Sequence, residues 1–258
     1  CVQWHTDDSN KLIFSDYGGF VYLADISRND DDAIISKIQA HRDKCWSIDV
    51  HPYFPKLIAT ASQDRTVKIL DTDYCRAAMK IALPCASSTD HVALIFDLRN
   101  TRKPYSKPII HNGPLAYSMF LDENDILTSA AACEIKISSV FDGSCKMRMG
   151  NHENRRYFVG LTHNNGDYIL SGSENGYVHL YVPELPVPVI SNELTSCSTS
   201  ALSFRPNSDE FFCGDRQGNI RLMQLQAIPK DKSIIDAFKS NLYQRNKVHA
   251  AFTIPSPV

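Results

Sequence analysis

The stretch from Ala40 to Asp71 constrains the fold more than any other part of the chain, because short apolar runs alternate in it with polar turns. His41 precedes the first run, and a Ser-x-Asp-x-Thr motif at Ser62–Thr66 follows about two dozen residues later. Between them lies the turn sequence His51–Pro55. Runs of this length bounded by turn residues are typical of short β-strands. The stretch therefore predicts one unit built from several such strands.

The same alternation recurs along the chain about six times. The first unit covers Cys1 to Ile38, the fourth begins at His111, the fifth begins at His152, and the sixth runs from Ser200 to Leu225. Turn residues such as Asp16–Gly19 separate the strands. Four short strands per unit, repeated at this spacing, predict an all-β fold, a WD-repeat β-propeller.

The third unit is incomplete. An outer strand at Lys80–Leu83 is followed by Pro84–Thr89 and then directly by the strand-like run that begins at Asp90. Two strands expected before Asp90 are absent. Either residues are missing from this sequence or the blade is truncated. We favour missing residues, because a propeller without two inner strands would expose unpaired strand edges.

The C-terminal segment differs in kind from the repeats. We expect the propeller to cover residues 1–226 and an extension to cover 227–258. Apolar residues at helical spacing predict an amphipathic helix at 231–246. A strand within 248–254 would complete a blade.

Composition excludes several classes of function. The net charge is −2 and the pI is about 6.5, so the chain has no overall preference for nucleic acid or for an acidic membrane. No apolar run is long enough for a transmembrane helix, and no signal peptide is visible. The eight cysteines form no Cys-x-x-Cys pair, which favours buried, reduced thiols over a metal site. No nucleophile motif or phosphate-binding loop is present, so we expect no cofactor, no metal and no catalytic residue in this chain.

One His–Asp pair is predicted to be structural. In WD repeats, the His before the first strand and the Asp in the turn before the third strand can form a hydrogen bond across the blade. His41 and Asp64 occupy these positions, which favours a blade clamp over a catalytic dyad. Leu70 replaces the Trp of the usual Trp-Asp ending, so the clamp is expected to lack its last member.

Several motifs go beyond a generic WD repeat. They are Ser15–Gly19, Trp46–Asp49, Asp97–Thr101, Asn154–Leu161, Ser171–Asn175 and Val178–Tyr181. Together they resemble the C-terminal WD-repeat domain of the constitutive photomorphogenesis (COP-type) RING ubiquitin-protein ligases and of their plant relatives. The resemblance covers roughly Cys1 to Gln226. The family's propeller has seven blades, so this chain would lack the first blade and part of the third.

The resemblance implies a substrate receptor of a ubiquitin ligase that binds short acidic peptides with a Val-Pro core on its top face. The residues implied in peptide binding are Tyr17, Lys44, Trp46, His91 and Phe158. Aromatic side chains suit a flat Val-Pro unit, and Lys44 suits flanking carboxylates. The family's RING finger and coiled coil lie upstream, so a ubiquitin-protein transferase activity would belong to the full-length protein. The resemblance also implies cullin-type ligase adaptors as partners, nuclear and cytoplasmic localisation, and neither nucleic-acid nor membrane binding.

One departure from the family changes the expected charge of this site. Asn112-Gly113 replaces a basic pair, which leaves Lys44, with Arg42 or Arg155, to supply positive charge. Trp46 has an alternative interpretation as a core residue between blades, and Phe158 has one as an ordinary core residue. The alternative function for the whole chain is a non-catalytic WD-repeat scaffold in a multiprotein complex.

Overall fold

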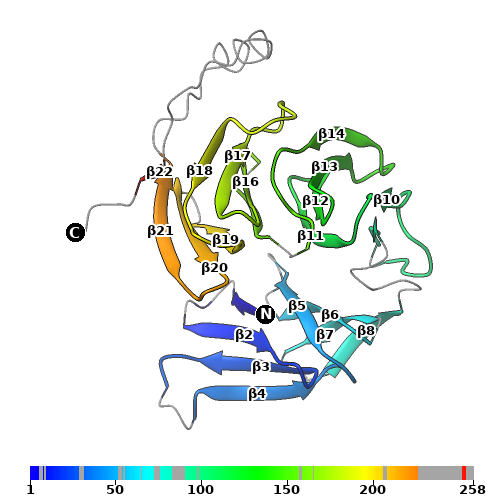
Figure 1. Cartoon of the computed structure of the whole chain (residues 1–258). Coiled ribbons are helices and arrows are strands. Elements are labelled where there is room, and N and C mark those ends of the chain that lie inside the picture. Colours follow the sequence, from blue (N-terminus) through cyan, green and yellow to red (C-terminus); the bar gives the residue numbers. More distant parts are fainter. Residues whose placement is uncertain are drawn as a thin grey trace, which may run out of the picture. The chain divides into compact units, whose positions relative to one another are not determined.

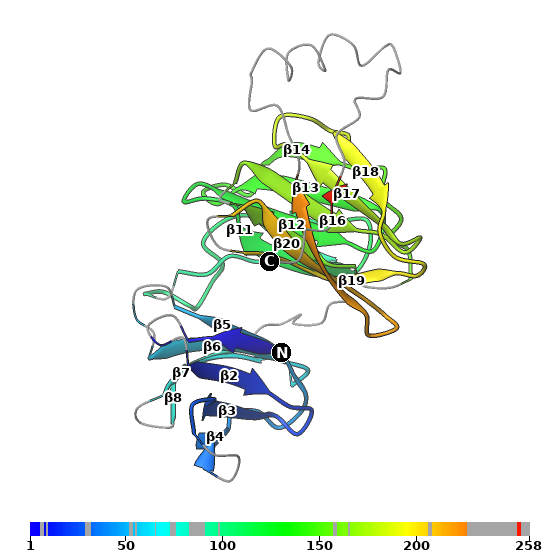
Figure 2. The same cartoon turned by 90° about the vertical axis from the view of Figure 1, so that its left-hand side faces the viewer.

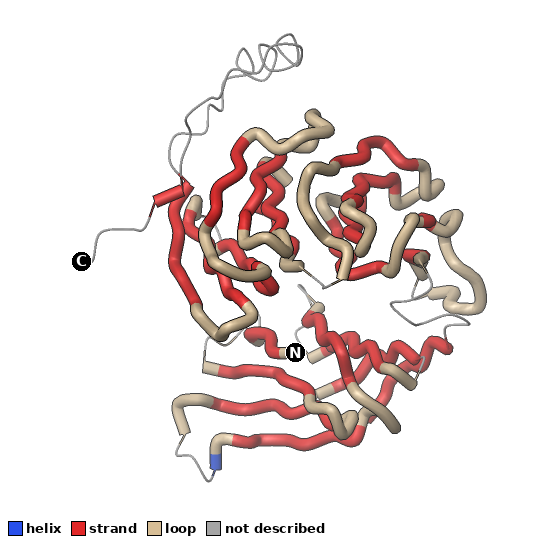
Figure 3. Tube along the Cα trace, in the orientation of Figure 1, coloured by secondary structure: helices blue, strands red, loops and turns tan. Residues whose placement is uncertain are grey.

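Almost all regular structure in the chain is β-strand, which confirms the all-β prediction (Figure 3). The computed structural model describes residues 1–5, 8, 10–28, 32–51, 54, 56–64, 66–72, 76–82, 91–97, 99–156, 159–164, 166–205, 208–225 and 252–253. The backbone packs as two units, Cys1–Asp90 and His91–Val258, and each is described by itself. Within the described residues, no helix has the length and apolar character needed to cross a membrane.

The first unit contains two four-stranded antiparallel sheets (Figure 1). One consists of β1 (Val2–Trp4), β2 (Lys11–Ser15), β3 (Phe20–Asp25) and β4 (Ile34–Gln39), and the other of β5 (Cys45–Val50), β6 (Leu57–Ser62), β7 (Thr66–Asp71) and β8 (Arg76–Ala82). In each sheet the spatial order of the strands follows the chain. Such a meander is the blade of a β-propeller.

Alternating side chains of these two sheets form the core of the first unit. Ile13 and Val21 come from the first sheet, and Ile48, Ile58 and Leu70 come from the second; all are at most 2% exposed. Burying an aliphatic side chain of this size contributes about 1.5–3 kcal/mol. The period-2 pattern that predicts the strands thus also supplies the contact between the two blades.

The second unit contains a two-stranded sheet and three four-stranded meanders, which Figure 2 shows from the side. The small sheet pairs β9 (Val92–Ala93) with β10 (Ile109–Ile110). The meanders are β11 (Leu115–Phe120), β12 (Asp125–Ala130), β13 (Glu134–Ser139) and β14 (Cys145–Met149); β15 (Leu161–Asn164), β16 (Tyr168–Gly172), β17 (Tyr177–Tyr181) and β18 (Ile190–Glu193); and β19 (Thr199–Phe204), β20 (Glu210–Asp215), β21 (Ile220–Leu225) and β22 (Phe252–Thr253).

The described residues form five four-stranded sheets and one two-stranded sheet, which agrees with the prediction of about six units, one of them incomplete. The incomplete unit is the β9–β10 sheet. The outer strand predicted for this unit at Lys80–Leu83 belongs instead to β8 of the second sheet, because Arg76–Ala82 pairs with β7. Strand β22, which pairs with β21 through Phe252 and Leu225, comes from the segment expected to form an extension. The helix expected at 231–246 lies outside the described residues.

The β15–β18 sheet is buried on both faces. Ile169 and Tyr181 pack against the β11–β14 sheet, whereas Leu170 and Leu180 pack with the β19–β22 sheet around Phe211. Burial on both faces explains why β16 and β17 read as nearly continuous apolar runs instead of alternating ones.

Candidate functional site

The His41 imidazole and the Asp64 carboxylate lie together in the second sheet. His41 Nδ1 is 3.1 Å from Asp64 Oδ2, and His41 Nε2 is 2.9 Å from Thr60 Oγ1. The Thr66 hydroxyl and backbone N–H both donate to Asp64 Oδ1. Asp64 therefore ties the β6–β7 turn to the segment that precedes β5. Leu70 is fully buried in the apolar core and takes no part in this network.

This network holds Asp64 ionised. Burial on its own would raise the pKa of Asp64, but hydrogen bonds from Thr66, from the Arg42 N–H and from His41 outweigh it and lower that pKa to about 2. Burial lowers the pKa of His41, and the neighbouring Asp64 partly offsets this. A buried histidine with both ring nitrogens engaged, and 1% exposed, has no access to a substrate.

A second clamp, which the sequence analysis did not identify, lies in the β11–β14 sheet. His111 Nδ1 is 3.0 Å from Glu134 Oε2, and His111 Nε2 is 2.8 Å from Thr128 Oγ1. Lys136 and Arg148 also contact the Glu134 carboxylate, at 3.3 and 3.1 Å. The sequence separation of 23 residues is the same as that between His41 and Asp64. That spacing was the signal that could have revealed this pair.

Tyr17 lies in a turn whose conformation is fixed by Asp16 on one side and by Gly19 on the other. The Asp16 carboxylate accepts hydrogen bonds from the Gly18 N–H (2.8 Å), the Phe20 N–H (2.9 Å) and the Tyr22 hydroxyl (2.9 Å). Gly19 has a φ of 80°, a conformation that favours glycine. The turn therefore fixes the backbone on which the exposed Tyr17 ring is carried.

The same turn docks on the segment that leads into β5. The Cys45 N–H donates to Asp16 O at 3.3 Å, and the His41 N–H donates to Gly19 O at 2.9 Å. A Cβ on Gly19 would lie 2.5 Å from His41 O. Two stretches that are distant in sequence are thereby held at a fixed separation.

Trp46 lies at a β-bulge. Cys45 pairs with Ser62 and Ser47 pairs with Ala61, so Trp46 is the extra residue. It is 54% exposed, whereas Cys45 before it and Ile48 two residues after it are 2% and 1% exposed. A bulge redirects a side chain out of the regular alternation. The exposure of Trp46 is not that of a core residue between blades.

Three of the predicted site residues meet within the first unit. The Tyr17 and Trp46 rings contact edge to face, with centroids 5.8 Å apart. Lys44 Nζ lies 5.2 Å from the Tyr17 centroid and 5.7 Å from the Trp46 centroid. Both distances are within the range of a cation–π contact. The result is an exposed aromatic corner with one cation beside it.

The remaining predicted site residues come from the second unit, which is described by itself. His91, with a φ of 61°, belongs to the second unit. Phe158 lies outside the described residues. Arg155 is exposed, and its N–H is held by the Glu174 carboxylate. Asn112 is exposed, and a Cβ on the following glycine would lie 2.3 Å from Ala131 O; this close approach excludes a side chain at the second position of the family's basic pair.

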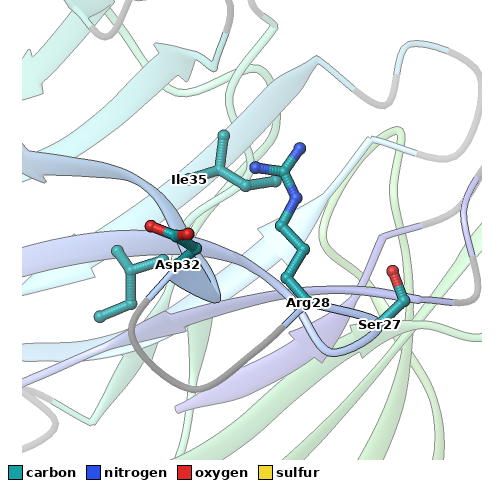
Figure 4. A pocket seen from close by; sticks show the side chains of 5 residues that line it. Ser27, Arg28, Asp32 and Ile35 are labelled. Carbon is teal, nitrogen blue, oxygen red and sulfur yellow. The ribbon is translucent and has the colours of Figure 1, made fainter.

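Within the described ranges, no three His, Cys, Asp or Glu side chains converge as metal ligands would. A pocket beside the β3–β4 turn is lined by Ser27, Arg28, Asp32, Ile34 and Ile35 (Figure 4). Ser27 and Arg28 are both engaged by Asp25, so we assign this pocket no reacting group.

The blade pattern is matched by a family model. The WD domain, G-beta repeat, matches residues 33–71, the stretch that contains the His41–Asp64 clamp and Trp46. Residues 33–71 thus form a WD repeat, and the five four-stranded meanders of the described chain have the blade topology of a β-propeller.

Its curated homologues are COP1 and SPA proteins. The chain is 26% identical to E3 ubiquitin-protein ligase COP1 of Arabidopsis thaliana over 255 residues, which cover 88% of this chain and 37% of that protein. It is 26% identical to Protein SPA1-RELATED 3 and 25% identical to Protein SUPPRESSOR OF PHYA-105 1 of the same plant, covering 86% and 87% of this chain and 30% and 25% of those proteins. The chain thus spans about a quarter to a third of the length of these relatives. The predicted resemblance is confirmed.

Proposed function

We propose that this chain is the substrate-recognition propeller of a ubiquitin ligase and that it binds short acidic peptides with a Val-Pro core. The observation that carries the proposal is the cluster of Tyr17, Lys44 and Trp46. Two exposed rings at 64° to each other provide apolar walls for a proline ring and a valine side chain. The Lys44 ammonium lies within reach of both rings and can pair with flanking carboxylates.

The energetics favour a proline-containing ligand. Proline has a fixed φ, so such a peptide loses little conformational entropy when it binds. Trp and Tyr are also common among the residues that dominate binding energy at interfaces. The similarity to an E3 ubiquitin-protein ligase by name supports a role in a ligase. In this proposal the transferase itself lies in another part of the protein or in a partner.

Peptide binding tests the proposal directly. A fluorescein-labelled peptide with Val-Pro flanked by glutamates should bind the full chain with micromolar or tighter affinity, measured by fluorescence polarisation. Trp46→Ala and Lys44→Glu should each abolish the binding. Because Trp46 is exposed, its removal should change the free energy of unfolding by no more than about 0.5 kcal/mol.

Two variants in the second unit serve as matched controls. Phe120→Ala removes another exposed aromatic side chain, and Lys146→Glu reverses another surface cation; both should bind like the wild type. Equal affinity for a peptide with Ala-Ala in place of Val-Pro would contradict the proposal. So would unchanged binding in both Trp46→Ala and Lys44→Glu. No binding by the wild type would leave a scaffold as the better account.

The same proposal extends to the cellular context. It places the protein in the nucleus and cytoplasm, together with cullin-type ligase adaptors. Co-purification of a cullin with the tagged protein tests this extension, and a purified complex without any cullin would contradict it.

A further inference from the structure

Positive charge is concentrated in one part of the second unit. Between His91 and Leu121 the sequence contains four cations and a single acid, Asp97. The cations are Arg99, Arg102, Lys103 and Lys107. The chain as a whole carries a net charge of −2. We call Arg99–Lys107, which connects β9 to β10, the basic segment.

The single acid neutralises only one of these cations. Arg99 Nε is 3.0 and 3.1 Å from the two Asp97 carboxylate oxygens, Arg99 Nη2 is 2.7 Å from Oδ2, and the Arg99 N–H also donates to Asp97 Oδ1. Arg102, Lys103 and Lys107 are exposed and form no ion pair within the described part of the chain. Three cations are thus available to an external partner.

The second half of the basic segment is anchored to the rest of the second unit. The Tyr105 N–H donates to Ile95 O at 2.7 Å, and Ile95 and Ile109 are 8% and 3% exposed. A Cβ on Gly143 would lie 2.3 Å from Lys107 O, so the end of the segment rests against the β13–β14 turn. A segment held in this way loses less entropy on binding than a free loop.

An aromatic side chain lies among the cations. Tyr105 is 49% exposed and falls between Lys103 and Lys107 in sequence. Tyrosine offers a large contact area at low entropic cost, and it is enriched at protein interfaces. Arg102 and Lys103 are adjacent in sequence, whereas Lys107 lies four residues further along the chain. Arg102 and Lys103 are therefore the centre of positive charge.

We propose that the basic segment is a second docking surface and that its ligand is an acidic stretch of a partner protein, with an apolar side chain placed on Tyr105. An acidic protein is favoured over nucleic acid, because three unpaired cations would release only a few counterions from the phosphate backbone and so would gain little affinity from their release. The affinity for single-stranded RNA would then fall with salt with a slope of only about −2, whereas one aromatic anchor and a few carboxylates suffice for a peptide. The basic segment shares no residue with the Tyr17–Lys44–Trp46 cluster, and this proposal does not depend on the function proposed for that cluster.

A labelled acidic peptide tests the surface. The probe is a fluorescein-labelled peptide of alternating Glu and Leu residues without Val-Pro, titrated with the full chain at low salt. Arg102→Gln/Lys103→Gln should weaken its binding by about fivefold or more, and Tyr105→Ala should weaken it as well. The matched control Lys146→Gln/Arg205→Gln removes the same charge from two cations that already have carboxylate partners; its affinity should stay within about twofold of the wild type.

Two further measurements test whether the probe binds at the Lys44 site instead and whether the basic segment prefers RNA. Lys44→Glu should leave binding of this probe within about twofold of the wild type, and loss in Lys44→Glu alone would place the probe in the other site and overturn the proposal. A single-stranded RNA that binds more tightly than the peptide, and loses affinity in Arg102→Gln/Lys103→Gln, would also overturn it. So would equal weakening in the matched control, or no binding of the peptide by the wild type.

Discussion

The Tyr17 ring meets the Trp46 indole edge to face, with the ring centroids 5.8 Å apart. Tyr17 is 71% exposed and Trp46 is 54% exposed, so each ring keeps much of its surface in water. Burial of these side chains therefore contributes little to folding. Their arrangement is maintained by the hydrogen-bonded turn at Asp16 and by the bulge in β5.

Removal of the Tyr17 ring should expose Trp46 further. In a Trp4→Phe background, Trp46 is the remaining tryptophan of the chain, so its emission can be measured alone. Tyr17→Ala should increase the acrylamide quenching constant of Trp46, whereas Tyr105→Ala in the second unit should leave it unchanged. Equal quenching in all three proteins would contradict the contact.

Gly19 should be intolerant of any side chain. Gly19→Ala forces an alanine into a conformation with positive φ, and it also places a Cβ 2.5 Å from His41 O. Gly218 has a similar φ of 86° but nothing within 4 Å of its Cβ position. We expect Gly218→Ala to cost about 1 kcal/mol, and Gly19→Ala to cost at least twice as much.

Urea unfolding measures both costs, and Gly19→Ala should in addition weaken binding of the Val-Pro peptide. An equal loss of stability in the two variants would show that the docking of the turn on the β5 segment contributes nothing.

The Asp64 clamp should be important for the stability of the first unit. Asp64→Ala removes the carboxylate partner of His41 Nδ1 and the acceptor of both Thr66 donors, so we expect a loss of about 2–3 kcal/mol. Both tryptophans of the chain, Trp4 and Trp46, lie in this unit. Their emission therefore reports its unfolding in urea. Asp209→Ala, which removes an exposed carboxylate, is the control. It should change the free energy of unfolding by less than about 0.5 kcal/mol, as is usual for surface sites.

Acid should destabilise the second unit well before its carboxylates titrate. Burial lowers the pKa of His111 to about 4 with help from Lys136, and burial lowers the pKa values of His152 and His179 to about 4. Since the unfolded histidines titrate near 6.5, the unfolded state binds more protons between about pH 6.5 and pH 4. Stability is thus complete above about pH 6.5 and falls as the pH drops through this window.

Each of these histidines can cost up to about 2 kcal/mol at pH 5. Urea midpoints from circular dichroism at pH 7.5 and pH 5 measure the effect, and His152→Gln/His179→Gln should flatten the pH dependence. A wild-type midpoint that does not change between these two pH values would contradict the prediction.

The clamp could be predicted from the sequence where the residues follow the usual motif. His41 and Asp64 stand in a recognisable Ser-x-Asp-x-Thr context, and the structure places them within 3.1 Å. His111 and Glu134 have the same separation in sequence, but glutamate stands in place of aspartate and the Ser-x-Asp-x-Thr motif is absent. The spacing alone did not predict this pair. The blade boundaries could also be predicted, because the alternation of apolar and polar residues indicates β-strands directly.

The exposure of Trp46 could not be predicted from alternation. A regular strand would place Trp46 on the same face as Ile48 and Val50, which are buried; this is the basis of the alternative interpretation as a core residue. The bulge shifts the register by one residue, and nothing in a single sequence announces it. The meeting of Trp46 with Tyr17 depends on a long-range hydrogen bond between Asp16 and Cys45, which local pattern does not encode.

The bulge in β5 has counterparts in the second unit. Register shifts at the same place in β11 and β19 leave Ala116 and Ser200 as the extra residues. Backbones that accept an alanine, a serine or a tryptophan at this position place few demands on side-chain size there. In each of these three repeats, one codon can therefore change what the blade presents to a ligand while the paired strands stay the same. Ligand preference in such chains is free to diverge faster than their architecture.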